Sequence, residues 1–227
     1  MRVLAIDTST AVGSVAIVDA SGVLAERSAH VPGGHLEWLV GAIEETLALA
    51  DIQRGAIEGL VVSKGPGGFS GLRIGIATAA AWAHALQRPL AGVSTLEVIA
   101  SGVDATGLVF AALDARRGEI IGALFRRGDR TERLTADLLL TPDAVRDRLP
   151  PGSERIVIAG DALERHAPAL LEALSPWTAA APPAQWWPRA SIGGALGRAR
   201  LLRGERDDPL GLVPDYVRRP EAREFRW

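Results

Sequence analysis

A glycine-rich segment between a short apolar run and a helix is the part of this sequence best suited to binding an anion. Residues 60–62 (LVV) predict a buried strand, and residues 63–75 (SKGPGGFSGLRIG) predict a tight turn that leads into a helix. The glycines permit backbone angles that other residues avoid, and we expect the Ser70 hydroxyl to cap the helix. Free amides at such a helix start point toward one spot, which suits a phosphate or a carboxylate.

The same segment matches neither of two common phosphate-binding motifs. A P-loop has Gly-Lys followed by Ser or Thr after the glycine turn, whereas Lys64 here precedes the glycines. The dinucleotide motif requires a glycine at its sixth position, which is Ser70 when counted from Gly65. Two interpretations therefore stay open: a phosphate cradle, or glycines that only allow close packing of the strand against the helix.

A second polar cluster follows the predicted strand at residues 3–6. Asp7 comes directly after this strand, and Thr8 and Ser9 come next. A carboxylate and hydroxyls at a strand end can hold a metal-bound phosphate, or they can close the turn through hydrogen bonds to the backbone. Both roles remain open from the sequence.

A charged turn, residues 114–119 (DARRGE), separates two further apolar stretches. Its two arginines, Arg116 and Arg117, either face solvent or lie at the mouth of a cleft where they contact phosphate.

Metal and nucleophile motifs are absent from the sequence. The four histidines include no His-Glu-x-x-His and no pair spaced for zinc on one helix, and the chain has no cysteine. No Gly-x-Ser-x-Gly motif of serine hydrolases occurs either. We therefore expect no catalytic residue, no metal and no cofactor.

The elements that position these residues occur twice in the same order. Three strands, a helix, a strand and a second helix are predicted in each half of the chain, so the sequence predicts an α/β fold with two lobes of duplicated βββαβα topology. In the first half the predicted elements are 3–6, 13–18, 23–28, 36–47, 59–63 and 71–86. In the second half they are 108–113, 119–125, 131–135, 141–149, 155–159 and 161–174.

The region after these repeats is predicted to hold a linker at residues 178–188 and a last helix at residues 190–203. We expect three parts: an N-terminal lobe (1–104), a C-terminal lobe (105–185), and a helix and tail (186–227) that pack back on the lobes.

The first two predicted helices are suited to close packing. The first carries a stripe of apolar residues, and the second is rich in glycine and alanine, so that a neighbouring helix can approach closely. Either the protein's own core or a partner protein could occupy such a surface.

Composition limits the remaining possibilities. The 227 residues carry a formal net charge of −2, so the chain lacks the basic field that gripping a long nucleic acid requires. The N-terminus leads directly into a strand, and no apolar run is long enough to span a bilayer. We expect a cytoplasmic protein with no membrane contact.

Four segments taken together resemble the bacterial TsaB family. They are residues 4–10 (LAIDTST), 65–75 (GPGGFSGLRIG), 114–116 (DAR) and 214–218 (PDYVR), and the similarity extends over essentially the whole chain. TsaB proteins are non-catalytic relatives of the TsaD/Kae1 enzymes and are also classed as peptidase M22 or glycoprotease-like proteins.

This resemblance implies the sugar kinase/Hsp70/actin architecture and a part in tRNA modification. The implied product is threonylcarbamoyladenosine, formed at the adenine 3′ to the anticodon in tRNAs that read codons starting with A. The implied partners are a TsaD-type catalytic subunit and a TsaE-type ATPase, with tRNA bound only through the complex and a homodimer possible when the chain is alone.

The resemblance also implies site residues. The pairing surface is expected on the first two helices, at Leu36, Leu39, Val40, Ile43, Leu47, Gly71, Leu72, Gly75, Thr78, Ala79 and Trp82. The turns with a possible anion contact comprise Asp7, Thr8, Ser9, Gly67, Phe69, Ser70, Arg73 and Arg116.

The two-histidine metal motif of TsaD is missing from this sequence, as are a second Asp-Gly-Gly phosphate loop and the Gly-Gly adenosine motif. These absences favour a scaffold that completes another protein's active site. The alternatives are an ATP-binding kinase or ATPase of the same fold and a metalloprotease of the M22 type.

Overall fold

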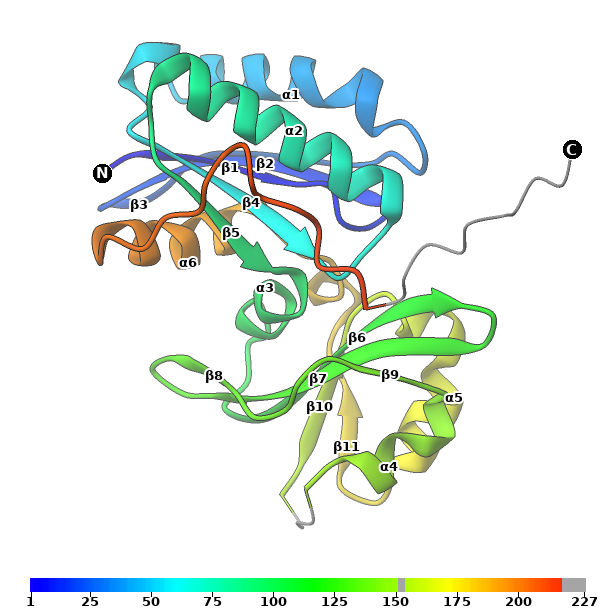
Figure 1. Cartoon of the computed structure of the whole chain (residues 1–227). Coiled ribbons are helices and arrows are strands. Elements are labelled where there is room, and N and C mark those ends of the chain that lie inside the picture. The colour runs from blue at the N-terminus through cyan, green and yellow to red at the C-terminus, as the bar shows by residue number, and fades with distance from the viewer. Residues whose placement is uncertain (151–153, 218–227) are drawn as a thin grey trace, which may run out of the picture.

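The computed structural model of the chain describes residues 1–150 and 154–217, which form two β-sheets with helices packed on their faces (Figure 1). The first sheet has the strand order β3-β2-β1-β4-β5. Its strands are β1 (Val3–Asp7), β2 (Val12–Asp19), β3 (Gly22–His30), β4 (Gly59–Gly65) and β5 (Leu90–Ser94). β1 pairs antiparallel with β2 and parallel with β4, which places it at the centre of the sheet. Residues 3–6 of β1 are apolar and buried, because helices cover both faces of this strand.

Helices cover both faces of this sheet. α1 (His35–Leu49) and α2 (Phe69–Leu86) lie on one face, and α6 (Ala190–Leu202) lies on the other (Figure 1). Successive side chains of β1 point to opposite faces, so Leu4 packs in the core under α1 and α2, whereas Val3 packs in the core under α6.

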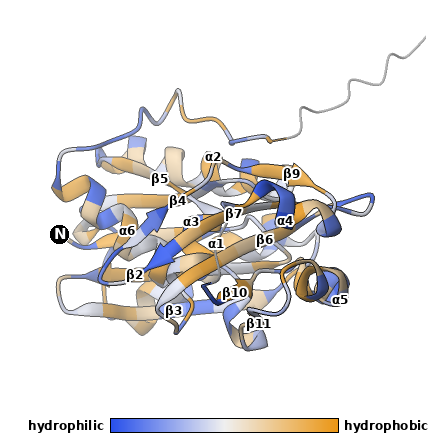
Figure 2. Ribbon diagram, turned by 90° about the horizontal axis from the view of Figure 1, so that it is seen from below, coloured by the Kyte–Doolittle hydropathy of each residue, from blue (hydrophilic) through white to orange (hydrophobic). Residues whose placement is uncertain are grey.

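The second sheet has the order β11-β10-β6-β7-β8, with β9 also paired to β7. α4 (Val145–Arg148) and α5 (Leu163–Ala173) cover one face, and α3 (Thr95–Ser101) covers the other. Figure 2 shows hydrophobic residues concentrated in the central strands. The strands are β6 (Gly107–Arg116), β7 (Glu119–Arg127), β8 (Thr131–Arg133), β9 (Leu138–Leu140), β10 (Ile156–Ala159) and β11 (Thr178–Ala180).

Several short elements differ from the sequence prediction. β11 and a 3-10 turn (Pro183–Gln185) occupy the predicted linker, and the predicted helix 141–149 is a 3-10 turn (Pro142–Ala144) followed by the four-residue α4. β5, β9 and α3 were not predicted. α3 lies between the two sheets with most of its residues buried, so it lacks the one-sided apolar pattern by which helices are recognised.

The predicted boundaries at residues 104/105 and 185/186 stay predictions. β5 ends at Ser94 and β6 begins at Gly107, while α6, from the predicted third part, packs on the first sheet. Within the described part of the chain, no helix combines the length and the hydropathy needed to cross a membrane.

Candidate functional site

A cleft of about 650 Å³ lies between the lobes, where loops at the carboxyl ends of central strands from both sheets meet. The first lobe contributes Ser9, Gly67 and Phe69, and the second contributes Arg116 and Asp161. Crevices outside the carboxyl ends of parallel strands are the usual ligand sites of α/β sheets. The cleft thus brings together Ser9, Gly67, Phe69 and Arg116, four of the residues for which the sequence suggested an anion contact.

Asp7 lies below this cleft and holds the first turn together. Its side chain is buried, and its carboxylate accepts hydrogen bonds from the Ser9 N–H (3.0 Å), the Ser9 hydroxyl (2.8 Å) and the Ser63 hydroxyl. Burial raises the pKa of Asp7 although the hydrogen bonds from Ser63 and Ser9 oppose that rise. The carboxylate therefore ties β1 to β4, and its described contacts are those of a structural residue.

The glycine turn packs against the β1–β2 turn of the same chain. The Gly68 N–H donates to the Ser9 carbonyl oxygen (2.7 Å), and a methyl group at Gly67 would overlap that oxygen. α2 begins at Phe69 with Gly68 at the cap position, so Ser70 lies inside the first turn and makes no capping bond, which corrects the expected cap. These contacts favour the close-packing interpretation over a phosphate cradle.

Gly71 and Gly75 also serve the chain's own packing. The Thr8 hydroxyl donates to the Gly71 carbonyl oxygen (2.8 Å). A methyl group at Gly71 would overlap the Thr8 carbonyl oxygen, and one at Gly75 would overlap the Thr8 hydroxyl. The expectation that these glycines receive a partner protein is therefore corrected: their space is filled by Thr8.

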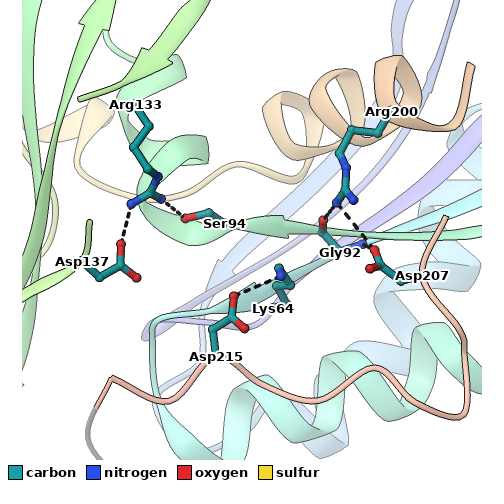
Figure 3. Close-up of polar contacts among 8 residues, drawn as sticks. All are labelled: Lys64, Gly92, Ser94, Arg133, Asp137, Arg200, Asp207 and Asp215. Atoms are coloured by element: carbon teal, nitrogen blue, oxygen red, sulfur yellow. Dashed lines mark hydrogen bonds and ion pairs between the residues drawn. The ribbon is translucent and has the colours of Figure 1, made fainter. Parts of the chain in front are cut away.

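The tail after α6 returns to the glycine turn, a specific contact that the expectation of a tail packed on the lobes did not identify. The Asp215 N–H donates to the Lys64 carbonyl oxygen (2.7 Å), and the Lys64 ammonium lies 3.2 Å from the Asp215 carboxylate (Figure 3). At Gly65, where φ is +126°, a Cβ atom would lie 2.8 Å from the Asp215 carbonyl oxygen. Two of the family-like segments thus meet in space; Arg218, at the end of one, lies outside the described residues.

An aromatic stack extends this contact to the rim of the cleft. The Phe69 and Tyr216 rings stack with centroids 5.2 Å apart, and the Arg73 guanidinium lies 3.8 Å from the Phe69 centroid. The Arg73 Nε–H also donates to the Tyr216 hydroxyl (2.9 Å). Arg73 therefore lies beside the cleft, in contact with a residue that lines it.

The second-lobe wall is a cluster of charged side chains around Asp114. Its carboxylate lies 3.5 Å from Arg116, Arg165 and His166, and its N–H donates to Asp161 (2.8 Å). Burial raises the pKa of Asp161 to about 6. Among residues 1–150 and 154–217, no three His, Asp or Glu side chains gather as a metal site would require.

A second cleft, of about 1000 Å³, is also lined by both lobes and is rich in arginine. Several of its basic groups are matched by carboxylates, as Figure 3 shows for Arg133 with Asp137 and for Arg200 with Asp207. Arg200 also donates to the Gly92 carbonyl oxygen, and the Gly92 N–H donates to Asp207 (2.8 Å). Arg200 and Asp207 thus form hydrogen bonds with both backbone polar groups of Gly92 on the edge strand β5. These backbone groups are therefore not available for pairing with another strand.

The predicted pairing surface divides between core and solvent. Leu36 and Val40 are exposed (66% and 61%), and Thr78 and Trp82 are half-buried. The remaining predicted residues are buried in this chain's own core, which corrects their assignment to a docking surface. They are Leu39, Ile43, Leu47, Gly71, Leu72, Gly75 and Ala79.

The solvent side of α2 carries small residues that were not on the predicted list. Ala77, Ala81 and Ala85 are exposed and follow one another at four-residue spacing, so they lie on one side of the helix. We use the name outer helix face for these exposed residues of α2 and the exposed Leu36 and Val40 of α1.

Known proteins resemble this chain over its full length. The family model for TsaD, tRNA N6-adenosine threonylcarbamoyltransferase, matches residues 20–166. The tRNA threonylcarbamoyladenosine biosynthesis protein TsaB of Bacillus subtilis is 30% identical over 229 residues, covering 100% of this chain and 98% of the relative. The Escherichia coli protein of the same name is 33% identical over 70% of this chain and 71% of its own length.

Solved structures agree with these matches. YeaZ from Pseudomonas aeruginosa superposes with a TM-score of 0.84 at 26% identity, covering 95% of this chain and 99% of the other. Component A of (R)-2-hydroxyglutaryl-CoA dehydratase from Acidaminococcus fermentans, at 11% identity and a TM-score of 0.52, shares the fold alone. The predicted two-lobed sugar kinase/Hsp70/actin fold is confirmed.

Proposed function

Since this chain belongs to the TsaB family, whose relatives carry a name in tRNA threonylcarbamoyladenosine biosynthesis, we propose that it acts there as a non-catalytic subunit. In this role it binds and activates a TsaD-type transferase, which modifies the adenine 3′ to the anticodon in tRNAs that read codons starting with A. A TsaE-type ATPase joins the pair, and tRNA reaches the chain through the complex.

The outer helix face is the observation that carries this proposal. Leu36 and Val40 expose most of their side chains one helical turn apart, where burial would contribute about 1.5–3 kcal/mol each. The alanines at positions 77, 81 and 85 leave α2 without bulk on its solvent side, so a partner helix can approach closely. The same face would pair two copies of this chain when no TsaD-type subunit is present.

A supporting role, rather than catalysis, agrees with how the polar groups near the cleft are used. The Asp7 carboxylate is occupied by Ser9 and Ser63, and the Gly68 amide is occupied by the Ser9 carbonyl oxygen. These groups are engaged by other parts of the same chain, which supports a structural role for them.

Pairing is tested by replacing the exposed apolar residues with aspartate. We expect the double variant Leu36→Asp/Val40→Asp to fold normally and to bind a purified TsaD-type subunit at least about 100-fold more weakly, because two charges would be buried against apolar surface. Leu49→Asp is the matched control, since Leu49 is an exposed leucine on another side of the same helix. Leu39→Asp is unsuitable, because Leu39 is in the core and its replacement would unfold the lobe.

Binding is measured by titration calorimetry, folding by circular dichroism, and activity by tRNA modification with and without this chain. Equal affinity of the double variant and the Leu49 control would show that docking lies elsewhere. Transferase activity that does not respond to the addition of this chain would refute the activating role.

A further inference from the structure

We propose that the rim of the interlobe cleft binds a single-stranded segment of RNA, with Arg116 and Arg165 on its phosphates and the Phe69–Tyr216 stack against a base. This inference deepens the proposed function and rests on it.

Both arginines lie beside the same largely buried carboxylate. Asp114 is 10% exposed and lies 3.5 Å from each guanidinium, whereas Arg116 and Arg165 are 71% and 64% exposed. Two cations therefore lie beside the same carboxylate while most of each guanidinium faces outward. A planar guanidinium held in this way retains N–H donors for phosphate oxygens.

The turn that carries Arg116 keeps arginines where other residues are preferred. Arg116 and Arg117 have φ angles of +64° and +56°, in the left-handed region that costs an ordinary residue about 1–2 kcal/mol. The two-residue hairpin turn is formed by Arg117 and Gly118, where asparagine and glycine are the usual residues, and Arg116 is the last residue of β6. The turn therefore places basic side chains at the cleft mouth although its backbone favours other residues.

The opposite wall supplies a stacking platform. Phe69 is an exposed aromatic residue, its ring is stacked on Tyr216 with an interplanar angle of 25°, and both residues line the same cleft as Arg116 and Arg165. Bases of single-stranded RNA stack on aromatic rings and guanidinium planes, while arginines follow the phosphate backbone.

The charge of the cleft favours an RNA strand over a tightly held mononucleotide. The carboxylates of Asp114 and Asp215 are matched by arginines and by Lys64, and the Gly68 amide that would cradle a polyphosphate is bound to Ser9. The exposed Glu164 opposes any anion in the cleft. We therefore expect modest affinity, which adds to contacts made by the partner subunit.

The test uses the complex of this chain with its TsaD-type partner and fluorescein-labelled tRNA at about 50 mM salt, with anisotropy as the readout. Arg116→Gln/Arg165→Gln should weaken binding about tenfold and make the slope of log affinity against log salt less steep by about 1.4, because two phosphate contacts of about 0.7 each are lost. Phe69→Ala should weaken binding about fivefold or more with an unchanged salt dependence, because stacking is uncharged. Glu164→Gln should strengthen binding several-fold.

Arg126→Gln is the matched control, since Arg126 is an exposed arginine of the same lobe that is paired with Glu154 outside the cleft. Circular dichroism and pairing measurements accompany each variant. Affinities of the arginine and Phe69 variants equal to that of the control would overturn the inference, and so would displacement of the tRNA by ATP at micromolar concentration, which would indicate a mononucleotide site.

These outcomes are separable from failure of the proposed function. If the unmodified chain does not pair with the TsaD-type subunit, the proposed function fails. If pairing is intact and the substitutions in the cleft leave the affinity for tRNA unchanged, only the RNA inference fails.

Discussion

Replacing Asp161 with asparagine should stabilise the protein at neutral pH and should leave it nearly unchanged at pH 4. Burial is the main cause of the raised pKa of Asp161, about 6 against an ordinary value of 3.8, and repulsion by Asp114 and Glu164 adds to it. The N–H of Asp114 and the charge of Arg116 act in the opposite direction. The folded protein therefore holds a proton on Asp161 more tightly than the unfolded chain does.

The sign and the size of the effect follow from this difference. The stabilising contribution of protonated Asp161 is fully present below about pH 4 and is lost as the pH rises through about 6. About two pKa units at about 1.4 kcal/mol each give an upper value of about 3 kcal/mol for the cost of the charged form at pH 8. Asparagine keeps an oxygen that accepts from the Asp114 N–H, so Asp161→Asn should recover about 1–3 kcal/mol there.

The assay is urea denaturation of the wild type and of the variant from pH 4 to pH 8. The difference in the free energy of unfolding should be near zero at pH 4 and should grow with pH to its full value by about pH 7. Asp129→Asn, an exposed position in the β7–β8 turn, is the control and should show a pH-independent difference. The buried Asp7, whose pKa is also raised, is present in all three proteins, so its contribution cancels.

A variant that is less stable than the wild type at pH 8 would refute this reasoning. So would a difference that is constant between pH 5 and pH 8. Either result would mean that the hydrogen bond from Asp114 and the charge of Arg116 outweigh the burial of the carboxylate.

Two paired substitutions test the packing of the glycine turn by chemical denaturation. Gly71→Ala should lower the free energy of unfolding by about 1–3 kcal/mol, because the added methyl group would overlap Thr8. Gly41→Ala should raise it by up to about 1 kcal/mol, because the added methyl group meets open space on a helix. Equal effects of the two substitutions would contradict the role assigned to Thr8. Gly65→Ala should lower the free energy of unfolding by more than about 1 kcal/mol, because Gly65 has a positive φ and contacts the tail. Asp215→Ala should lower it by less than about 1 kcal/mol, because the ion pair of Asp215 with Lys64 is partly exposed. A larger loss for Asp215→Ala than for Gly65→Ala would refute this order.

The sequence by itself determined the fold class and most of the element order. Residues 3–6 of β1 are all apolar because both faces of this strand are covered, and this pattern is visible without coordinates. The repeated order of strands and helices then predicted two lobes. Elements of three to seven residues, such as β9 and α3, were missed because so few residues do not establish a period.

The sequence also placed Ser9, Gly67, Phe69 and Arg116 in polar turns, and the structure brings these turns to one cleft. It gave no signal for Asp161 or Arg165 beside Asp114, because their proximity depends on β10 pairing with β6. The arginines at positions 116, 117, 126 and 127 do not form one surface, since neighbouring residues on β7 point to opposite faces: Arg126 pairs with Glu154, whereas Arg127 lines the second cleft.

Only the tertiary structure decided which part of an apolar or glycine pattern faces the chain's own core. In α1, Leu36 and Val40 are each three residues before Leu39 and Ile43, which is less than one helical turn. Leu36 and Val40 nevertheless face solvent, whereas Leu39 and Ile43 are buried in the core between the helix and the sheet. Residue types record that a position is apolar or small, but burial is set by what the rest of the chain places against it. The contact of Asp215 with Gly65, which are 150 residues apart, is of this kind.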